Sequence, residues 1–229
     1  MTSSTNRAIS AVLLDVDGTL VNSNDAHANA WVAAFAEAGI DVPFDDVRRL
    51  IGMGGDKLMP RVSKLTEDSP EGKVVAERRG EIFTNDYLPT IEPFRDADRL
   101  IAALKDRGFT VVAASSAKKA ELRPLLERAH AAGLLDDETS SDDAEASKPE
   151  PDIIEAALKR ADASADQTIM IGDTPYDIEA AQRAGVSTIA FRSGGWDDTD
   201  LAGAIAIYDG PWDLLAQLDQ SPLKHAPRE

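Results

Sequence analysis

The chain has 229 residues, of which 43% are hydrophobic, and its 41 acidic and 24 basic residues give a formal net charge of −17. That length and apolar content suit one domain, or one domain with a smaller insertion, and the absence of cysteine excludes disulfides and thiol catalysis. The negative charge argues against nucleic acid and anionic membranes as partners, and any anionic ligand would need a locally positive site.

The N-terminal residues 1–10 do not have the pattern of a secretory signal. They carry Thr, Ser and Asn where such a signal has a basic stretch followed by an apolar segment. Elsewhere no run approaches the roughly 20 apolar residues that span a bilayer. We therefore expect a cytoplasmic protein.

Short apolar runs recur along the chain and are separated by helical patterns. The runs predicted as buried strands are Ala11–Leu14, Phe109–Ser115, Thr168–Gly172, Ser187–Phe191 and a candidate fifth, Ala204–Tyr208. Between two of them, Leu100 and Leu104 share one helix face, and Gly108 marks the end of that helix. Strands alternating with helices predict an α/β fold, a Rossmann-like core with a parallel sheet covered on both faces.

One stretch breaks this alternation, because from Val21 to about Thr90 helical patterns occur without a convincing strand. We interpret residues 22–90 as a helical cap inserted after the first strand, and residues 1–21 and 91–229 as the core domain. The insertion would lie over the carboxyl end of the sheet, where open α/β folds bind ligands, and would act as a lid. The tail Ser221–Glu229 has two prolines and little to bury, so we expect it to be loosely ordered.

Two acidic residues follow the first strand in the motif DVDGT. Asp15 and Asp17 are two residues apart and would project to the same side of the strand end. Such crowded carboxylates favour a cation between them, and their hard oxygen ligands suit Mg²⁺. A solvated acidic loop is the alternative. A calcium loop of the EF-hand type is excluded, because its twelfth position would need a Glu and is Ala26 here.

A second acidic cluster, GDTPYD, follows the strand at Thr168–Gly172. Asp173 ends the strand, and Asp177 lies four residues later, where the next helix begins. The alternative is structural, with Asp173 as a turn residue and Asp177 stabilising the helix N-terminus. Because the ends of parallel strands meet at one edge of a sheet, one shared metal would explain both acidic clusters.

Two further polar residues could bind a phosphate. Ser115, at the end of its strand, could donate a hydroxyl hydrogen bond to a phosphate oxygen, and Lys148, in SKPEPD, could supply positive charge. Taken singly, Ser115 is better explained as an ordinary strand end and Lys148 as a solvated surface lysine.

In this order DVDGT, Ser115, KPEPD and GDTPYD resemble the four motifs of the haloacid-dehalogenase superfamily, and the resemblance runs from Asp15 to Phe191. The helical insertion resembles the cap of subclass I members such as phosphoglycolate phosphatases and β-phosphoglucomutases. The resemblance implies that Asp15 attacks phosphorus to form an aspartyl phosphate. It also implies that Asp17 protonates the leaving alcohol and then activates water.

The same resemblance implies a metal site and a phosphate site. Mg²⁺ would be held by Asp15, the backbone carbonyl of Asp17, and Asp173, with Asp177 in support. The residues expected to bind substrate are Thr19, Ser115, Ser116, Lys148 and His27.

Departures from the subfamily patterns narrow the expected reaction. Asp17 argues against carbon–halogen cleavage, because true dehalogenases need no metal and lack that second aspartate. His27 and Trp31 have the spacing seen in β-phosphoglucomutase-like proteins, although both could simply pack the cap helix, which is the interpretation we favour for Trp31. Gly55 stands where the mutase has a phosphate-binding arginine. A mutase must hold a bisphosphate intermediate away from water, so the absence of that arginine favours hydrolysis.

We therefore expect a phosphatase that acts on a small phosphomonoester, and a monomer. A sugar phosphomutase is the alternative. A non-catalytic protein on this fold would be expected to have lost Asp15 or Asp17, and both are present.

Overall fold

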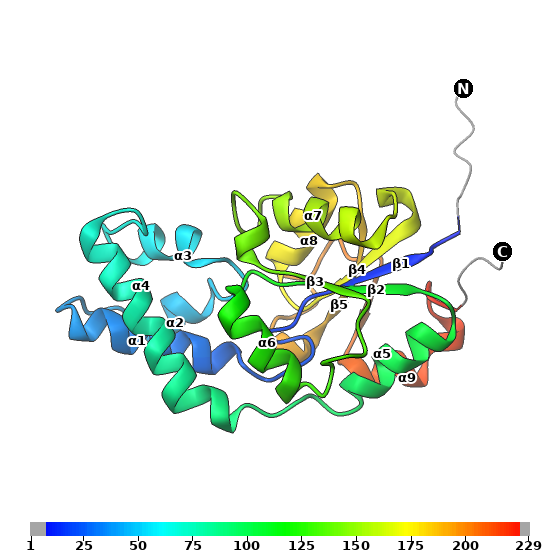
Figure 1. The fold of residues 1–229 in the computed structure, drawn as a ribbon, viewed down its shortest axis with the longest axis horizontal. Helices are drawn as coiled ribbons and strands as arrows, with labels where there is room; N and C mark the ends of the chain where they lie inside the picture. The colour runs from blue at the N-terminus through cyan, green and yellow to red at the C-terminus, as the bar shows by residue number, and fades with distance from the viewer. Residues whose placement is uncertain (1–7, 225–229) are drawn as a thin grey trace.

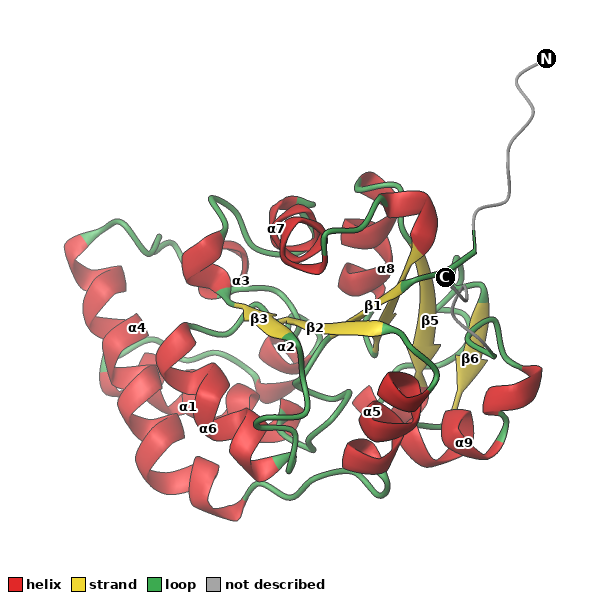
Figure 2. Cartoon of the chain, turned by 45° about the vertical axis from the view of Figure 1, so that its right-hand side comes forward, coloured by secondary structure: helices red, strands yellow, loops and turns green. Residues whose placement is uncertain are grey.

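The computed structural model describes residues 8–224, and within them six parallel strands form one sheet (Figures 1 and 2). The order across the sheet is β3-β2-β1-β4-β5-β6. The strands are β1 (Ala11–Leu14), β2 (Thr110–Ala114), β3 (Asp137–Thr139), β4 (Thr168–Gly172), β5 (Ser187–Phe191) and β6 (Ala206–Tyr208). Strand β1 is central, with Leu14 opposite Ala113 of β2 and Ile171 of β4.

Helices cover both faces of the sheet, as Figure 1 shows. Side chains alternate along β1, so Leu13 packs with α7 (Asp152–Ala161) and α8 (Pro175–Arg183), while Leu14 faces the other layer. That second layer contains α5 (Ala97–Asp106), α6 (Lys119–Arg128) and α9 (Pro211–Ala216). Strands that are buried on both faces have to be apolar at every position, which explains the uninterrupted sequence AVLL. The α/β fold with a parallel sheet is confirmed.

A helical insertion follows β1, as predicted, and lies beyond the carboxyl ends of the strands (Figure 1). It comprises α1 (Asn24–Glu37), α2 (Phe44–Arg48), α3 (Gly55–Val62) and α4 (Pro70–Ile82), followed by the π-helix Phe83–Tyr87 and the 3₁₀ turn Leu88–Thr90. The outgoing and returning connections lie side by side, because the Asn22 amide donates to the Glu92 carbonyl at 3.0 Å. The cap boundaries at residues 22 and 90 stay a prediction.

Two features differ from the expectations. Strand β3 was not predicted, because its sequence DET is polar and the strand forms the edge of the sheet. The tail is not loose over residues 221–224, since Ser221 is buried and Leu223 is fully buried in the core. The segment is ordered because the Leu223 side chain packs in the core. Residues 225–229, which belong to the same prediction, lie outside the described residues.

No helix within residues 8–224 combines the length and the apolar character needed to cross a lipid bilayer.

Candidate active site

The pairing of β1 with β4 places two of the predicted aspartates next to each other. The backbone amide of Asp15 donates to the carbonyl of Ile171 at 2.9 Å, which extends the ladder one residue beyond β1. Asp173 directly follows the end of β4. Because the two strands are parallel and in register, Asp15 and Asp173 leave the sheet at the same edge.

Asp177 joins them in a buried cluster. One carboxylate oxygen from each of Asp15, Asp173 and Asp177 lies within 4.8 Å of the others, and all three residues are buried. Burial raises the pKa of Asp15 well above its ordinary value, and the neighbouring carboxylates add to this against the attraction of Lys148. Burial, followed by the charge of Asp177, raises the pKa of Asp173 to about 7. Three hard oxygen donors with excess negative charge fit a divalent cation such as Mg²⁺.

Lys148 is the positive charge inside this cluster. It is fully buried, and its Nζ lies 2.6 Å from Asp15 Oδ1 and 2.7 Å from Asp177 Oδ1. It also donates to the Ala114 carbonyl at the end of β2, at 2.8 Å. Burial alone would lower the pKa of Lys148, but the two carboxylates outweigh it and raise the pKa, so the lysine stays charged. It is therefore an ordered site residue and not a solvated surface lysine.

The Asp173 carboxylate is held on several sides. The Thr19 hydroxyl donates to Asp173 Oδ1 at 3.1 Å, and Asn24 Nδ2 donates to Oδ2 at 2.9 Å. A Cβ atom at Gly18 would come within 2.2 Å of Asp173 Oδ2, and one at Gly194 within 1.8 Å. Only glycine fits at these two positions while the carboxylate keeps its place. Sequence reasoning missed Asn24, for which the sequence offers only its position seven residues after Asp17.

Asp17 lies apart from the carboxylate cluster and interacts with the cap. Its Oδ1 accepts from Ser23 Oγ at 2.5 Å and lies 2.8 Å from His27 Nε2, while no hydrogen bond from another residue in 8–224 reaches Oδ2. Burial raises the pKa of Asp17, but the charge and hydrogen bond of His27, with the bond from Ser23, outweigh it and lower the pKa. The His27 ring also stacks on Phe83 at 3.9 Å between centroids. His27 thus both packs in the cap and contacts Asp17.

Asp177 both caps a helix and belongs to the carboxylate cluster. Its Oδ2 accepts from the Thr174 amide at 3.0 Å and from the Thr174 hydroxyl at 2.6 Å, and its own amide donates back to that hydroxyl. This capping box begins α8. Because Oδ2 caps the helix, Oδ1 is held toward Lys148. The helix cap therefore orients the same side chain that belongs to the cluster.

The two serines after β2 differ in their surroundings. Ser115 is fully buried, and its Oγ accepts from the Ala117 amide at 3.0 Å. The Oγ of Ser116 is buried without a hydrogen-bond partner among the described residues, and Ser116 lines the cavity beside the aspartates. Ser116 is therefore the serine whose hydroxyl is placed to meet a ligand in this cavity.

A cavity of about 60 Å³ lies between the strand ends and the cap. This is room for a few water molecules. Asp15, Asp17, His27 and Ser116 line it from the predicted set. The other lining residues are Trp31, Ile51, Gly52, Met53, Gly54, Gly55, Arg79, Ala117 and Glu121, of which sequence reasoning missed the charged pair Arg79 and Glu121.

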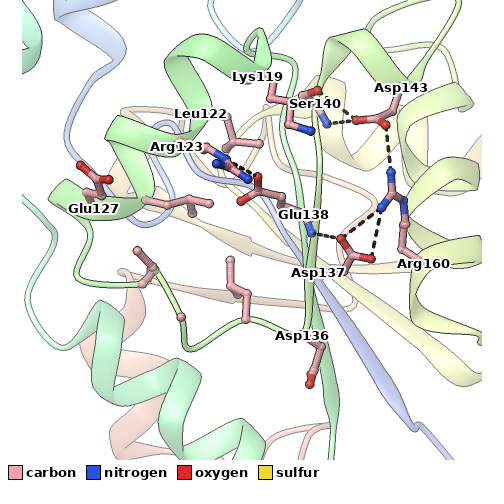
Figure 3. A pocket seen from close by; sticks show the side chains of 15 residues that line it. Lys119, Leu122, Arg123, Glu127, Asp136, Asp137, Glu138, Ser140, Asp143 and Arg160 are labelled. Carbon is pink, nitrogen blue, oxygen red and sulfur yellow. Dashed lines mark hydrogen bonds and ion pairs between the residues drawn. The ribbon is translucent and has the colours of Figure 1, made fainter.

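A larger hollow, of about 530 Å³, lies away from these residues at the outer edge of the sheet (Figure 3). Its arginines are occupied, with Arg123 on Glu138 and Arg160 between Asp137 and Asp143. No member of the carboxylate cluster lines it. Size therefore does not identify the site in this protein, and the chemistry of the smaller cavity does.

Comparison with known proteins agrees with this geometry. The family model described as haloacid dehalogenase-like hydrolase matches residues 12–191. The chain is 30% identical over 224 residues to the plasmid phosphoglycolate phosphatase of Cupriavidus necator, covering 95% of each. It is 33% identical over 210 residues to the chloroplastic protein SUPPRESSOR OF QUENCHING 1 of Arabidopsis thaliana, 89% of this chain and 19% of that protein's length. A solved hydrolase of Pseudomonas syringae superposes with a TM-score of 0.86 at 27% identity, covering 92% and 98% of the two chains.

Proposed function

This chain belongs to the haloacid dehalogenase-like hydrolase family, and from that premise we infer that it is a Mg²⁺-dependent phosphatase. We propose that it hydrolyses a small phosphorylated metabolite through an aspartyl-phosphate intermediate. The observation that carries this proposal is the buried group of Asp15, Asp173 and Asp177 around Lys148, next to a cavity that Asp15 lines.

In this proposal Asp15 is the nucleophile. An oxygen of Asp15 attacks phosphorus while the bond from phosphorus to the substrate alcohol breaks, which leaves an acyl phosphate on Asp15. Lys148 neutralises charge near the attacking carboxylate, and the Ser116 hydroxyl, which has no partner within residues 8–224, donates to a phosphoryl oxygen. These groups are already in place, so little reorganisation is needed during the reaction.

Asp17 acts in this proposal first as the general acid and then as the general base. Its Oδ1 is held by Ser23 and His27, and Oδ2 is the oxygen that meets the leaving group. Protonated Asp17 gives its proton to the leaving alcohol. The carboxylate that results then removes a proton from the water that attacks the acyl phosphate and releases inorganic phosphate. The hydrogen bond to His27 stabilises the ionised form that this second step requires.

Asp15, Asp173 and the backbone of Asp17 would hold Mg²⁺, with Asp177 nearby. The ion would offset the negative charge of the carboxylates and of the phosphoryl group. The charge excess of the cluster and the raised pKa values of Asp15 and Asp173 support this assignment.

The test is release of inorganic phosphate from a generic aryl phosphate, with Mg²⁺ and with EDTA. We expect Mg²⁺-dependent turnover that Asp15→Asn abolishes, while Asp41→Asn, at an exposed position, leaves turnover unchanged. Phosphate release by Asp15→Asn at the wild-type rate would refute the nucleophile. Assayed on a sugar phosphate, accumulation of an isomer without phosphate release would identify the alternative, a phosphomutase.

Three further predictions belong to this proposal. The cap comprises residues 22–90, the protein acts as a monomer, and it works in the cytoplasm.

A further inference from the structure

Arg79 reaches the candidate active site from the cap. It lies near the end of α4, and its side chain is 12% exposed and lines the same cavity as Asp15 and Asp17. Apart from His27, it is the one lysine, arginine or histidine among the described residues that line this cavity. Its guanidinium is therefore the fixed positive charge that the cap contributes to this cavity.

The guanidinium is held in place, but not all of its N–H donors have an acceptor among the described residues. Its Nη1 donates to Glu121 Oε2 of α6 at 2.8 Å, and its carbon lies 5.1 Å from the centroid of the Trp31 ring. Its Nε is buried and has no hydrogen-bond acceptor within residues 8–224. A buried N–H without an acceptor costs free energy. Arginine carries five N–H donors, so it can keep one carboxylate and accept a second anion.

The neighbouring cap loop has no competing cation. Gly55 stands where the resemblance discussed above has a phosphate-binding arginine, and a Cβ there would come within 2.2 Å of Glu67 Oε1 and 3.0 Å of Trp31. That space is therefore filled by an acidic side chain. Within this cavity, Arg79 is therefore the arginine or lysine that the described residues offer to a second anionic group on a substrate.

The present partner of Arg79 indicates which anion fits. Glu121 is 8% exposed on its side chain, so the pair is a largely buried bond between guanidinium and carboxylate across the seam between α4 and α6. A guanidinium already positioned against a carboxylate favours a compact carboxylate over a second phosphate group.

We propose that Arg79 is a specificity-determining residue that binds a carboxylate on the far end of the phosphomonoester substrate, with Glu121 as the internal anion that competes for the same guanidinium. The proposal rests on the proposed phosphatase function. It predicts a substrate of a few carbon atoms that carries a phosphate at one end and a carboxylate at the other.

The test uses two competitors that differ by one charge, phosphoglycolate and its carboxamide. Each competes with an aryl phosphate reporter in the presence of Mg²⁺, and the ratio of the two inhibition constants is measured for each variant. This ratio cancels the fraction of folded enzyme and does not require that either competitor is turned over.

The two partners should respond in opposite directions. Wild type should bind the carboxylate more tightly than the carboxamide. Arg79→Gln should weaken carboxylate binding about 10- to 100-fold, as expected for a lost hydrogen bond to a charged group, and leave carboxamide binding unchanged. Glu121→Gln should strengthen carboxylate binding, because it frees the guanidinium.

A purely structural contact between cap and core would behave differently. Both variants would then loosen the same contact and change both inhibition constants in the same direction, with an unchanged ratio, and that result would overturn the proposal. So would equal binding of the two competitors by wild type. Failure of the phosphatase function would be visible separately, as the absence of Mg²⁺-dependent hydrolysis of the reporter itself.

Discussion

The charges of the carboxylate cluster predict that one substitution, Asp15→Asn, has opposite effects on catalysis and on the stability of the fold. Asp15→Asn keeps the shape of the side chain and removes one of three buried negative charges. Burial and the neighbouring carboxylates raise the pKa of Asp15 despite Lys148, so at any pH above the ordinary pKa of an aspartate this side chain makes the metal-free fold less stable. An asparagine does not carry this cost. The metal-free variant should therefore be more stable than wild type at pH 7.5.

The size of the effect follows from the pKa. Each unit by which the folded pKa exceeds the unfolded one corresponds to about 1.4 kcal/mol. In a chain of this length, 1 kcal/mol changes Tm by about 2 to 4 °C. We expect Asp15→Asn to raise Tm in EDTA by several degrees while phosphate release is lost.

Lys148→Gln should have the opposite effect on stability. It leaves Asp15 and Asp177 without their shared positive charge, and breaking a buried ion pair in this way costs about 3 to 5 kcal/mol. The expected fall in Tm is about 6 to 20 °C, again with loss of activity. Thermal unfolding followed by circular dichroism in EDTA, beside the phosphate assay with Mg²⁺, measures both quantities. A lower Tm for Asp15→Asn than for Lys148→Gln would refute this account of the cluster.

Three more predictions concern the site. His27→Ala should raise the pKa of Asp17, so the acid form needed in the first step persists to higher pH and the basic limb of the kcat/KM profile moves to higher pH; an unmoved limb would contradict the role of the hydrogen bond. Gly194→Ala should displace the Asp173 carboxylate and weaken apparent Mg²⁺ affinity about 10- to 100-fold in an activity titration, and an unchanged titration would oppose it. Burial and Asp177 raise the pKa of Asp173 to about 7, so the folded protein holds a proton there that Mg²⁺ must displace. The rise in Tm on adding Mg²⁺ should therefore be larger at pH 8 than at pH 6, and equal rises would argue against a metal on Asp173.

Most of the sheet could be predicted because its strands are buried on both faces. The runs AVLL and TIMIG have no polar face, and each ends in an acidic motif. Strand β3 could not be found in this way, because DET lies at the edge of the sheet and pairs only with β2. Its presence depends on a neighbour and not on its own composition.

The site could be predicted where a functional residue directly follows a strand. Asp15 and Asp173 are placed by two neighbouring strands, so the resemblance and the geometry lead to the same residues. Arg79 and Glu121 were not predictable, because they are 42 residues apart and come from helices whose contact depends on how the cap lies over the core. No periodicity or motif marks such a pair.

The central position of β1 has a consequence for synthesis of the protein. Its two partners, β2 and β4, begin about 100 and 150 residues later in the chain. At about 5 to 20 residues per second, the ribosome needs on the order of ten seconds before the second partner emerges. During that time the apolar segment AVLL has no sheet in which to be buried. We expect chaperones to bind nascent chains of this protein until residue 172 has left the exit tunnel.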